Sequence, residues 1–285
     1  MFDRTPPQNP FSFLYKDTFK DGVGAFGGAH RDFVGGILSF KTWASLGLYD
    51  VRLRYKRTLL GPLWITIGTA VTFTTMAMLF SAVLKQDIRH FLPYLGAGMI
   101  IWSLISGIVT EGPSIFIQYH HIIDTINMPL TIHPLRCMFR NLLIFSHNIV
   151  AYFIVVAFVG HMPGASALLL LITLPILCMA LFSAALILAM IGARFRDVGQ
   201  MVGVVMQLLF FLTPIIWSPS DIPNGRKYWV VGNPFHHLLE IVRQPLLGEI
   251  PSTLSLTVAT VTSITLTLIA YATFAVMRRR ISYWL

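Results

Sequence analysis

Six long apolar runs constrain this chain more than any other feature of its sequence. Each has roughly the 20 residues that an α-helix needs to cross the hydrocarbon core of a bilayer. Charged residues make up 12% of the chain, against about 25% in a soluble domain with a water-facing surface to cover. The sequence therefore predicts an all-α integral membrane protein with six transmembrane helices. The predicted spans are residues 62–84, 91–110, 139–160, 167–192, 201–217 and 254–277.

The positions of the basic residues predict the orientation. Six spans place both termini on the same side of the membrane. With that side in the cytoplasm, 16 of the 21 Lys and Arg residues are cytoplasmic, as the positive-inside rule requires. This distribution also explains the net charge of +9, so we expect membrane lipids and no nucleic acid as partners.

A helical stripe precedes the first span. Apolar residues recur at steps of three and four over residues 36–60, and Arg52, Lys56 and Arg57 lie off that stripe. This pattern is typical of an amphipathic helix that lies in the membrane interface. Residues 1–35 are rich in Gly and Pro and indicate a loosely ordered cytoplasmic lead-in. The stripe consists of Ile37, Phe40, Ala44, Leu48, Val51, Tyr55 and Leu59.

The segment 218–252, between spans five and six, is too apolar for an ordinary loop. Gly232, Pro234 and Pro245 interrupt it, so no piece is long enough to cross a bilayer. Irregular backbone at membrane depth is tolerated where protein or a cavity surrounds it. We therefore predict a re-entrant helical hairpin that dips from the outer surface and caps a pathway.

Four cations crowd the end of the interfacial helix, just before the first span. Arg52, Arg54, Lys56 and Arg57 fall within six positions. Two explanations fit this basic turn. Its residues orient the chain in the membrane, or they hold an anionic substrate at the level of the lipid headgroups.

The cytoplasmic loop 112–138 is apolar for a solvated loop. A short helix there would present apolar side chains to a cytoplasmic partner, or would pack on its own chain and on the headgroups. Beside this loop, Glu111 and Arg140 end spans two and three and are placed to pair. The apolar residues are Ile115, Ile117, Tyr119, Ile122, Ile123 and Ile126.

The sequence lacks the motifs of an enzyme. It has no Gly-Lys dipeptide, so a phosphate-binding loop of the G-x-x-x-x-G-K-[ST] type is excluded. Neither His pair, His120–His121 or His236–His237, presents two ligands on one helical face, so no metal site is expected. A membrane enzyme acting on lipid-linked sugars would need acidic clusters, whereas the acidic residues here are isolated. We therefore expect no cofactor and no energy source in this chain.

Several motifs in order resemble one family. The stretches "DVRLRYKRTLLGPLW" from Asp50, "RNLLIFSHN" from Arg140, "ARFRDVGQ" from Ala193, "FFLTPIIW" from Phe210 and "NPFHHLLEIVRQPLLG" from Asn233 resemble the ABC-2 type permeases that export polysaccharides such as O-antigen, galactan and teichoic acid. The resemblance covers about residues 36–280, and residues 36–285 are the expected transmembrane domain.

The resemblance implies a homodimer in the bacterial plasma membrane that works with two separate ABC ATPase subunits, which bind ATP and Mg. It implies a glycan on undecaprenyl diphosphate as the substrate, and it identifies 218–252 with the outer gate. A related ABC-2 permease exporting a drug or a small lipid is the alternative, because a fold does not fix its substrate. The resemblance also implies a coupling helix that docks on the ATPase, with candidate residues Ile115, Tyr119, His120, Ile122, Ile123 and Ile126.

The resemblance gives the basic turn and the spans a role. An Arg guanidinium offers planar donors suited to a diphosphate, so Arg52, Arg54 and Arg57, with Lys56, are candidate headgroup ligands. A glycan channel needs hydroxyl and aromatic lining. Threonines in membrane helices also bond to their own backbone, and aromatic residues also form interfacial belts, so both alternatives stay open. The candidate lining residues are Thr66, Thr69, Phe80, Tyr94, Phe210, Phe211 and Trp217.

Overall fold

The computed structural model describes residues 25–56, 61, 63–161, 163–219 and 228–285, and within them it is all-helical, with no strand. Helices α2, α3 and α4, each of at least 14 residues, precede α5, and short helical segments are interspersed among the longer helices that follow it. The elements are α2 (Ala25–Leu38), α3 (Phe40–Tyr55), α4 (Leu63–Leu84), α5 (Ile88–Glu111), η1 (Gly112–Ser114), α6 (Ile115–Gln118), α7 (His120–Thr125), α8 (Ile132–Phe158), η2 (Ala165–Leu169), α9 (Leu170–Arg194), α10 (Val198–Leu212), α11 (Tyr228–Val231), α12 (Pro234–Leu246) and α13 (Thr253–Trp284).

Five of the described helical segments are long and apolar enough to cross a membrane, which makes the chain a multi-pass membrane protein. They contain α4, α5, α8, α9 and α13 and correspond to five of the six predicted spans. The remaining predicted span, 201–217, overlaps α10, whose 15 residues would reach about 22 Å of a hydrocarbon core about 30 Å thick. The helix stops because Thr213 is extended, as the residue before a proline prefers.

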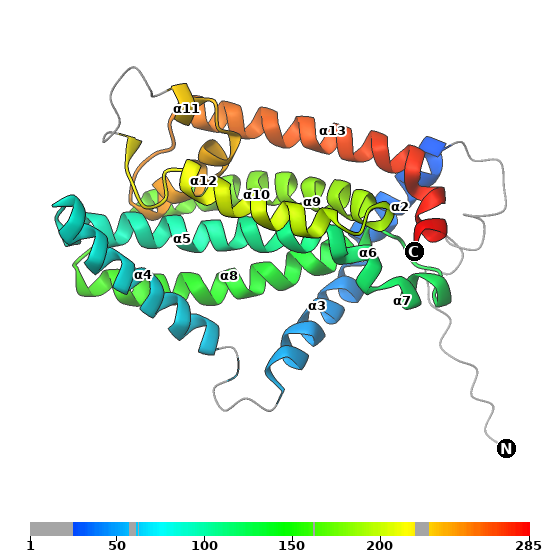
Figure 1. The fold of residues 1–285 in the computed structure, drawn as a ribbon, viewed down its shortest axis with the longest axis horizontal. Helices are drawn as coiled ribbons and strands as arrows, with labels where there is room; N and C mark the ends of the chain where they lie inside the picture. Colours follow the sequence, from blue (N-terminus) through cyan, green and yellow to red (C-terminus); the bar gives the residue numbers. More distant parts are fainter. Residues whose placement is uncertain (1–24, 57–60, 62, 162, 220–227) are drawn as a thin grey trace.

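The long helices lie side by side along the long axis of the molecule (Figure 1). One end carries α6, α7 and the C-terminus, and the other carries α11 and the connection between α4 and α5. We call these the α7 end and the α11 end. Helix α5 is the central element, because 14 of its 24 residues are buried, against 3 of the 22 residues of α4.

Close backbone approach fixes the α7 end of the bundle. A Cβ atom added to Gly192 of α9 would lie 2.0 Å from the carbonyl oxygen of Pro113 in η1. No side chain fits there, so glycine lets α9 pack directly on the backbone that follows α5. The start of the loop after α5 is therefore held against the transmembrane bundle.

Two predicted boundaries need correction. The sequence indicated loose order through residue 35, but Ala25–Leu38 is a helix, so that prediction is wrong for its last 11 residues. Phe33 explains the order, because its ring packs against the rings of Phe182, Tyr271 and Phe274. Helix α8 begins at residue 132 rather than 139. Its first two turns contain Pro134, which a first turn tolerates.

The predicted interfacial helix is divided in two. Helix α2 ends at Leu38 and α3 begins at Phe40, on either side of Ser39. Ser39 donates its hydroxyl hydrogen bond back to the carbonyl of Gly35 at 2.7 Å. Of the predicted apolar stripe, Val51 is buried whereas Ile37 and Phe40 are more than half exposed. Residues 57–60 of the prediction lie outside the described residues.

No described helix between residues 213 and 252 is long enough to cross a membrane. Helix α11 has 4 residues and α12 has 13. Two of the three interruptions predicted from the sequence, Gly232 and Pro234, fall where these helices meet. The prediction for Pro245 is wrong, because this proline lies inside α12, in its last turn. Pro234 occupies the first turn of α12, where its missing N–H is harmless, and the Asn233 side chain caps that helix by accepting from the Phe235 N–H at 3.0 Å.

Candidate functional site

The basic turn ends α3. Arg52 and Lys56 are exposed and lie four positions apart, so they share one helical face. The other two predicted headgroup residues are Arg54 and Arg57. Arg57 lies outside the described residues. Cations in the last turn of a helix interact favourably with the negative end of its dipole, so helix stability also favours this placement.

Arg54 points toward the protein instead. Its Nη2 atom lies 3.8 Å from Oε1 of Glu111, with the two side chains 50% and 30% exposed. An exposed ion pair of this kind contributes only about 0–1 kcal/mol. Arg54 is therefore in contact with α5 but is not committed to it, and remains accessible to a competing anion.

One turn before Arg54, a buried ion pair joins α3 to α8. Asp50 accepts hydrogen bonds from Nε of Arg136 at 2.7 Å and from Nη2 at 2.5 Å. Both side chains are largely buried, at 12% and 7% exposure. Two parallel bonds to one carboxylate give a defined orientation as well as strength. The helix that carries the basic turn is thus fixed to the start of α8.

The predicted pairing of Glu111 with Arg140 is confirmed. Arg140 Nη2 donates to Glu111 Oε2, and Asn141 Nδ2 donates to the same oxygen at 3.1 Å. Arg140 Nη1 also lies 3.4 Å from Oδ2 of Asp50, so the two carboxylates and two arginines form one network across α3, α5 and α8. Removing one partner from a buried pair costs about 3–5 kcal/mol.

The predicted coupling residues lie in the segment 115–126, which we call the coupling segment. It is formed by α6, Tyr119 and α7. Ile115 and Tyr119 are buried and face the protein, whereas Ile126 is 51% exposed. His120, Ile122 and Ile123 are partly buried. Apart from Gln118, the exposed side chains of the segment all lie in its second half.

Tyr119 connects the coupling segment to the ion network. Its ring stacks on His133, with centroids 5.3 Å apart, and the guanidinium carbon of Arg136 lies 4.1 Å from its centroid. Its hydroxyl lies 3.3 Å from Oδ2 of Asp50. Burial raises the pKa of Tyr119 above its ordinary value of 10.0, so the phenol stays neutral and can donate to that carboxylate.

A groove of about 360 Å³ lies between α5 and α10. Its lining combines aromatic rings with small polar groups. The rings offer flat apolar surfaces, and the hydroxyl and amide groups donate and accept hydrogen bonds, which suits a ligand with apolar faces and many hydroxyls. Phe210 and Phe211, predicted to line a channel, both belong to it. The lining residues are Trp102, Ser106, Thr110, Gly203, Met206, Gln207, Phe210 and Phe211.

Tyr94 and Trp217, two other predicted lining residues, meet at the α11 end. The Tyr94 hydroxyl donates toward the carbonyl oxygens of Pro214 and Trp217, at 3.3 and 3.2 Å. The guanidinium carbon of Arg243 lies 3.9 Å from the Tyr94 ring centroid, and Nη1 of that arginine donates to the Pro214 carbonyl at 2.7 Å. Arg243 is completely buried, and it also pairs with Glu240. These groups hold the bend after α10.

The other predicted lining residues belong to α4. Thr66 and Thr69 are partly buried, and Phe80 packs against a small apolar cluster that includes Phe73 and Leu92. None of the three lines the α5–α10 groove. The alternative for membrane threonines is confirmed elsewhere, because several donate to their own backbone one turn earlier. These are Thr72, Thr257, Thr260 and Thr267, at 2.7–2.8 Å.

Comparison with known proteins decides the family. Residues 43–247 match the ABC-2 type transporter family. The chain belongs to this family. The O-antigen export system permease protein RfbA of Myxococcus xanthus is 24% identical over 197 residues, which cover 68% of this chain and 76% of that protein. A protein of the same name from Klebsiella pneumoniae is 22% identical over 235 residues, covering 81% and 90%.

The family assignment confirms the resemblance drawn from the motifs and identifies the chain as the transmembrane subunit of an ABC-2 transporter. The matched region contains the basic turn, the ion network, the coupling segment and the groove. It contains neither α2 nor α13, so whatever these two helices contribute to this ABC-2 permease lies beyond the family match.

Some site residues escaped prediction although the sequence carries a signal for them. Trp102, Ser106 and Thr110 recur every four positions, so they share one face of α5. The same spacing joins Gln207 to Phe211 on α10. Asp50 stands in the quoted basic stretch, but nothing in the sequence alone pairs it with a residue 86 positions away. The spacing of residues along the sequence reveals which of them share a helical face. An ion pair between distant residues can be identified only once the fold is known.

Proposed function

We propose that this ABC-2 permease exports a lipid-linked polysaccharide, an O-antigen-like glycan on undecaprenyl diphosphate, across the bacterial plasma membrane. Two copies form the channel, and two separate ATPase subunits, which bind ATP and Mg, supply the energy. The substrate class follows the relatives, which are named as O-antigen export permeases.

One observation supports this function most strongly. The helix that carries the basic turn and the segment proposed to contact the ATPase meet in the same ion network. Asp50 lies one turn before Arg54, and it contacts both Arg136 and the hydroxyl of Tyr119. A diphosphate held by the exposed cations of α3 would therefore act on an element that is fixed directly to the coupling segment.

The groove between α5 and α10 supports a sugar substrate. Phe210 and the exposed Phe211 offer ring surface to the apolar C–H faces of sugar rings, and Ser106 and Gln207 offer hydrogen bonds to hydroxyl groups. In a homodimer, two such grooves would face a shared path.

The proposed topology has six spans, with the α7 end in the cytoplasm. Helix α10 supplies the short fifth span. Helix α12 supports the re-entrant hairpin, because it runs antiparallel to α5. Its first turn lies deep, with Phe235 6.0 Å from Trp102, and its last turn lies nearer the start of α5, where Arg243 covers Tyr94.

A complementation experiment tests the substrate. In a strain from which the gene for this chain is deleted, surface display of the glycan should stop and return with the wild-type chain. A variant with Arg52, Arg54 and Arg57 all changed to Lys keeps the charge that sets orientation but loses the guanidinium forks. We expect about a tenfold loss of export at unchanged membrane level, because each charge-assisted hydrogen bond contributes about 1.5–3 kcal/mol and exposure reduces that contribution. Lys56→Gln should have a smaller effect than Arg52→Gln.

Three results of this experiment would contradict the proposal in different ways. Normal glycan display in the deletion strain would favour a drug or small-lipid substrate. Normal export by the triple Lys variant would leave orientation as a sufficient explanation of the basic turn. An equal loss from Lys41→Gln, an exposed cation at the start of α3, would show that general charge rather than the basic turn matters.

Two further measurements test the contact with the ATPase and the topology. Replacing Ile122 and Ile123 with Asp should abolish co-purification of the ATPase, since unpaired carboxylates would be buried at the contact. In a background without Cys137 and Cys178, an impermeant thiol reagent should label a cysteine at position 252 in intact cells. A cysteine at position 126 should react only after permeabilisation. Labelling in the opposite pattern would reverse the topology.

A further inference from the structure

Asp32 is enclosed in protein, yet it belongs to no part of the site described so far. Its exposure is 1%. It lies on α2, outside the region 43–247 that matches the family. A carboxylate that is so completely removed from water needs strong partners to stay in the folded chain, so its partners indicate what it does.

The partners of Asp32 come from two distant elements. Its Oδ2 atom accepts from the backbone N–H of Leu130 at 3.1 Å and from Nε of Arg278 at 3.0 Å. Its Oδ1 atom accepts from the backbone N–H and the hydroxyl of Thr131, at 3.1 and 2.9 Å. Helix α8 starts at the next residue. The carboxylate thus satisfies N–H groups at a helix start, where an anion is also favourable.

The face of α2 is shaped for this contact. Gly28, Asp32 and Gly36 lie four positions apart and share one helical face. A Cβ atom added to Gly36 would lie 2.1 Å from Oγ1 of Thr131, and one added to Gly28 would lie 3.0 Å from Arg278 Nη1. Glycine on either side lets the helix approach closely enough for the carboxylate to reach backbone N–H groups.

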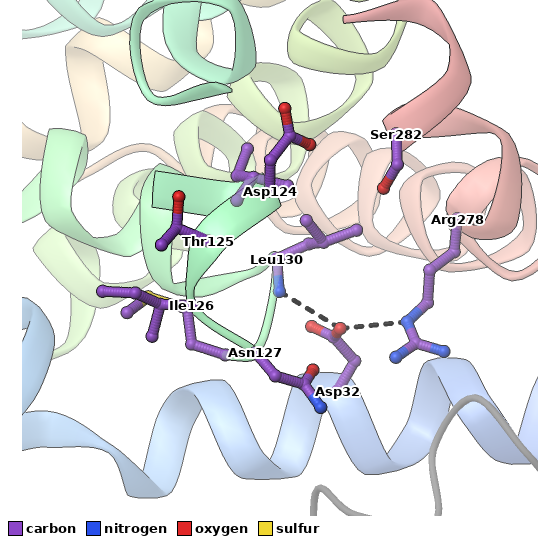
Figure 2. Close-up of a pocket in the computed structure, with 10 residues that line it drawn as sticks. Asp32, Asp124, Thr125, Ile126, Asn127, Leu130, Arg278 and Ser282 are labelled. Atoms are coloured by element: carbon purple, nitrogen blue, oxygen red, sulfur yellow. Dashed lines mark hydrogen bonds and ion pairs between the residues drawn. The ribbon is translucent and has the colours of Figure 1, made fainter. Parts of the chain in front are cut away.

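The same residues form one wall of a pocket of about 320 Å³ (Figure 2). Asp124, Thr125 and Asn127, at the end of the coupling segment and just after it, line the pocket together with Asp32 and Arg278. Figure 2 shows the Asp32 carboxylate between the Leu130 backbone and the Arg278 side chain. Asp32 therefore lies directly behind the coupling segment, at the point where its connection to α8 ends.

We propose that Asp32 is a positioning residue for energy coupling. It fixes residues 130–131 to α2 and α13, so that a push on the coupling segment reaches α8 and α13 instead of bending the connection. Residues 127–129 have no regular secondary structure, so this connection would otherwise transmit force poorly. The inference rests on the proposed contact between the coupling segment and the ATPase.

The test uses Asp32→Asn in the full permease with its co-purified ATPase. The variant loses the charge that pairs with Arg278 and one of the two acceptor oxygens. Hydrogen–deuterium exchange should rise at least tenfold for peptide amides in 120–131 and stay unchanged in α5. Glycan exported per ATP hydrolysed should fall about fivefold, with ATP hydrolysis and ATPase co-purification preserved. Asp87→Asn is the matched control, because Asp87 also accepts from a backbone N–H at a helix start, at the α11 end.

Each outcome has a defined meaning. Unchanged exchange in 120–131 would overturn the positioning role. Faster exchange with unchanged export per ATP would show that the segment is held but that its position does not matter for coupling, which would also overturn the proposal. A purely structural role would lower membrane level, ATP hydrolysis and export in parallel.

A milder variant covers the case in which Asp32→Asn fails to fold. Thr131→Val removes one hydroxyl donor and leaves three hydrogen bonds to the carboxylate. It should raise exchange in 120–131 and lower export per ATP in the same direction, by about twofold, and no change in either would again contradict the role of Asp32. Ile122→Asp alone separates this inference from the proposed function, because it targets the ATPase contact at a residue that does not line the Asp32 pocket.

Discussion

The two ends of α5 use the same pair of side chains for different purposes. At the α11 end, Arg243 lies 3.9 Å from the centroid of the Tyr94 ring. At the α7 end, Arg136 lies 4.1 Å from the centroid of the Tyr119 ring. Both arginines are buried and both tyrosine hydroxyls are hydrogen-bonded. The difference lies in where the acidic partner comes from.

At the α11 end the acidic partner is local. Glu240 stands three positions before Arg243 on the same helix, and the other bond of the arginine goes to the Pro214 carbonyl. At the α7 end the partner of Arg136 is Asp50, which comes from α3, 86 positions away. The ion pair within α12 holds the backbone bend after α10 in place. The ion pair between α3 and α8 makes these two helices move together. Only the α7 end is built to pass a displacement from one element to another.

The largest effect should come from breaking the local pair. Arg243→Met leaves Glu240 buried without its partner, which should lower the free energy of unfolding by about 3–5 kcal/mol. Thermal unfolding of the detergent-purified protein measures this loss. The double variant Arg243→Met with Glu240→Leu removes both charges and should recover most of it. A double variant no better than the single one would mean that the bond to Pro214, rather than the buried charge, carries the stability.

A smaller loss should follow from breaking the pair between elements. Asp50→Asn removes one acceptor oxygen and the charge facing Arg136, which should cost about 1.5–3 kcal/mol, because Arg140 keeps Glu111. Unlike the Arg243 variant, it should also reduce export beyond its effect on protein level. Asp197→Asn, which changes an exposed carboxylate without a side-chain cap bond, is the control. Equal export per molecule in the Asp50 and wild-type proteins would remove the distinction between the two ends.

The tyrosine hydroxyls offer a finer comparison. Tyr94→Phe and Tyr119→Phe each keep the ring under its arginine and should each cost about 0.5–1.5 kcal/mol. Tyr119→Phe combined with Asp50→Asn should be non-additive, since both changes affect the same contact. Tyr94→Phe combined with Asp50→Asn should be additive, because no partner is shared. Chemical unfolding of the three single variants and the two double variants checks this, and coupling in the second pair would show that the two ends communicate.

The smallest effect is expected in the first third of α13. Thr260 is partly buried and donates to its own backbone at the Leu256 carbonyl. Thr260→Ala should therefore change stability by no more than about 0.5 kcal/mol and leave export unchanged. A clear loss of export in a display assay would instead give this hydroxyl a place on the glycan path.

The sequence predicted the long helices well because their apolar runs are continuous. It predicted the start of α8 poorly for a physical reason. Arg136 makes residues 132–138 too polar for a predicted span, and only the fold brings Asp50 to neutralise it. The order of α2 was missed because Gly28 and Gly36 lower helix propensity. The contact that they permit lies almost 100 positions away along the chain.

The candidate site residues were likewise predictable only in part. Phe210 and Phe211 were predicted as lining residues, and they line the groove with residues that share their spacing. Tyr94 was predicted as a lining residue from its place among the aromatic residues of the outer half, and in the structure its hydroxyl supports the bend after α10. Arg243 was counted only as an outer charge, because nothing in a single sequence distinguishes a solvated arginine from a buried one.

The bond between Asp32 and Arg278 also orders events during biosynthesis. These residues are 246 positions apart, so the carboxylate lacks its guanidinium partner until the ribosome has made α13 and that helix has entered the membrane. Until then the junction behind the coupling segment is incomplete. A nascent chain that stalls before its last helix would therefore present a loosely held surface to the ATPase, and only finished permeases would engage it firmly.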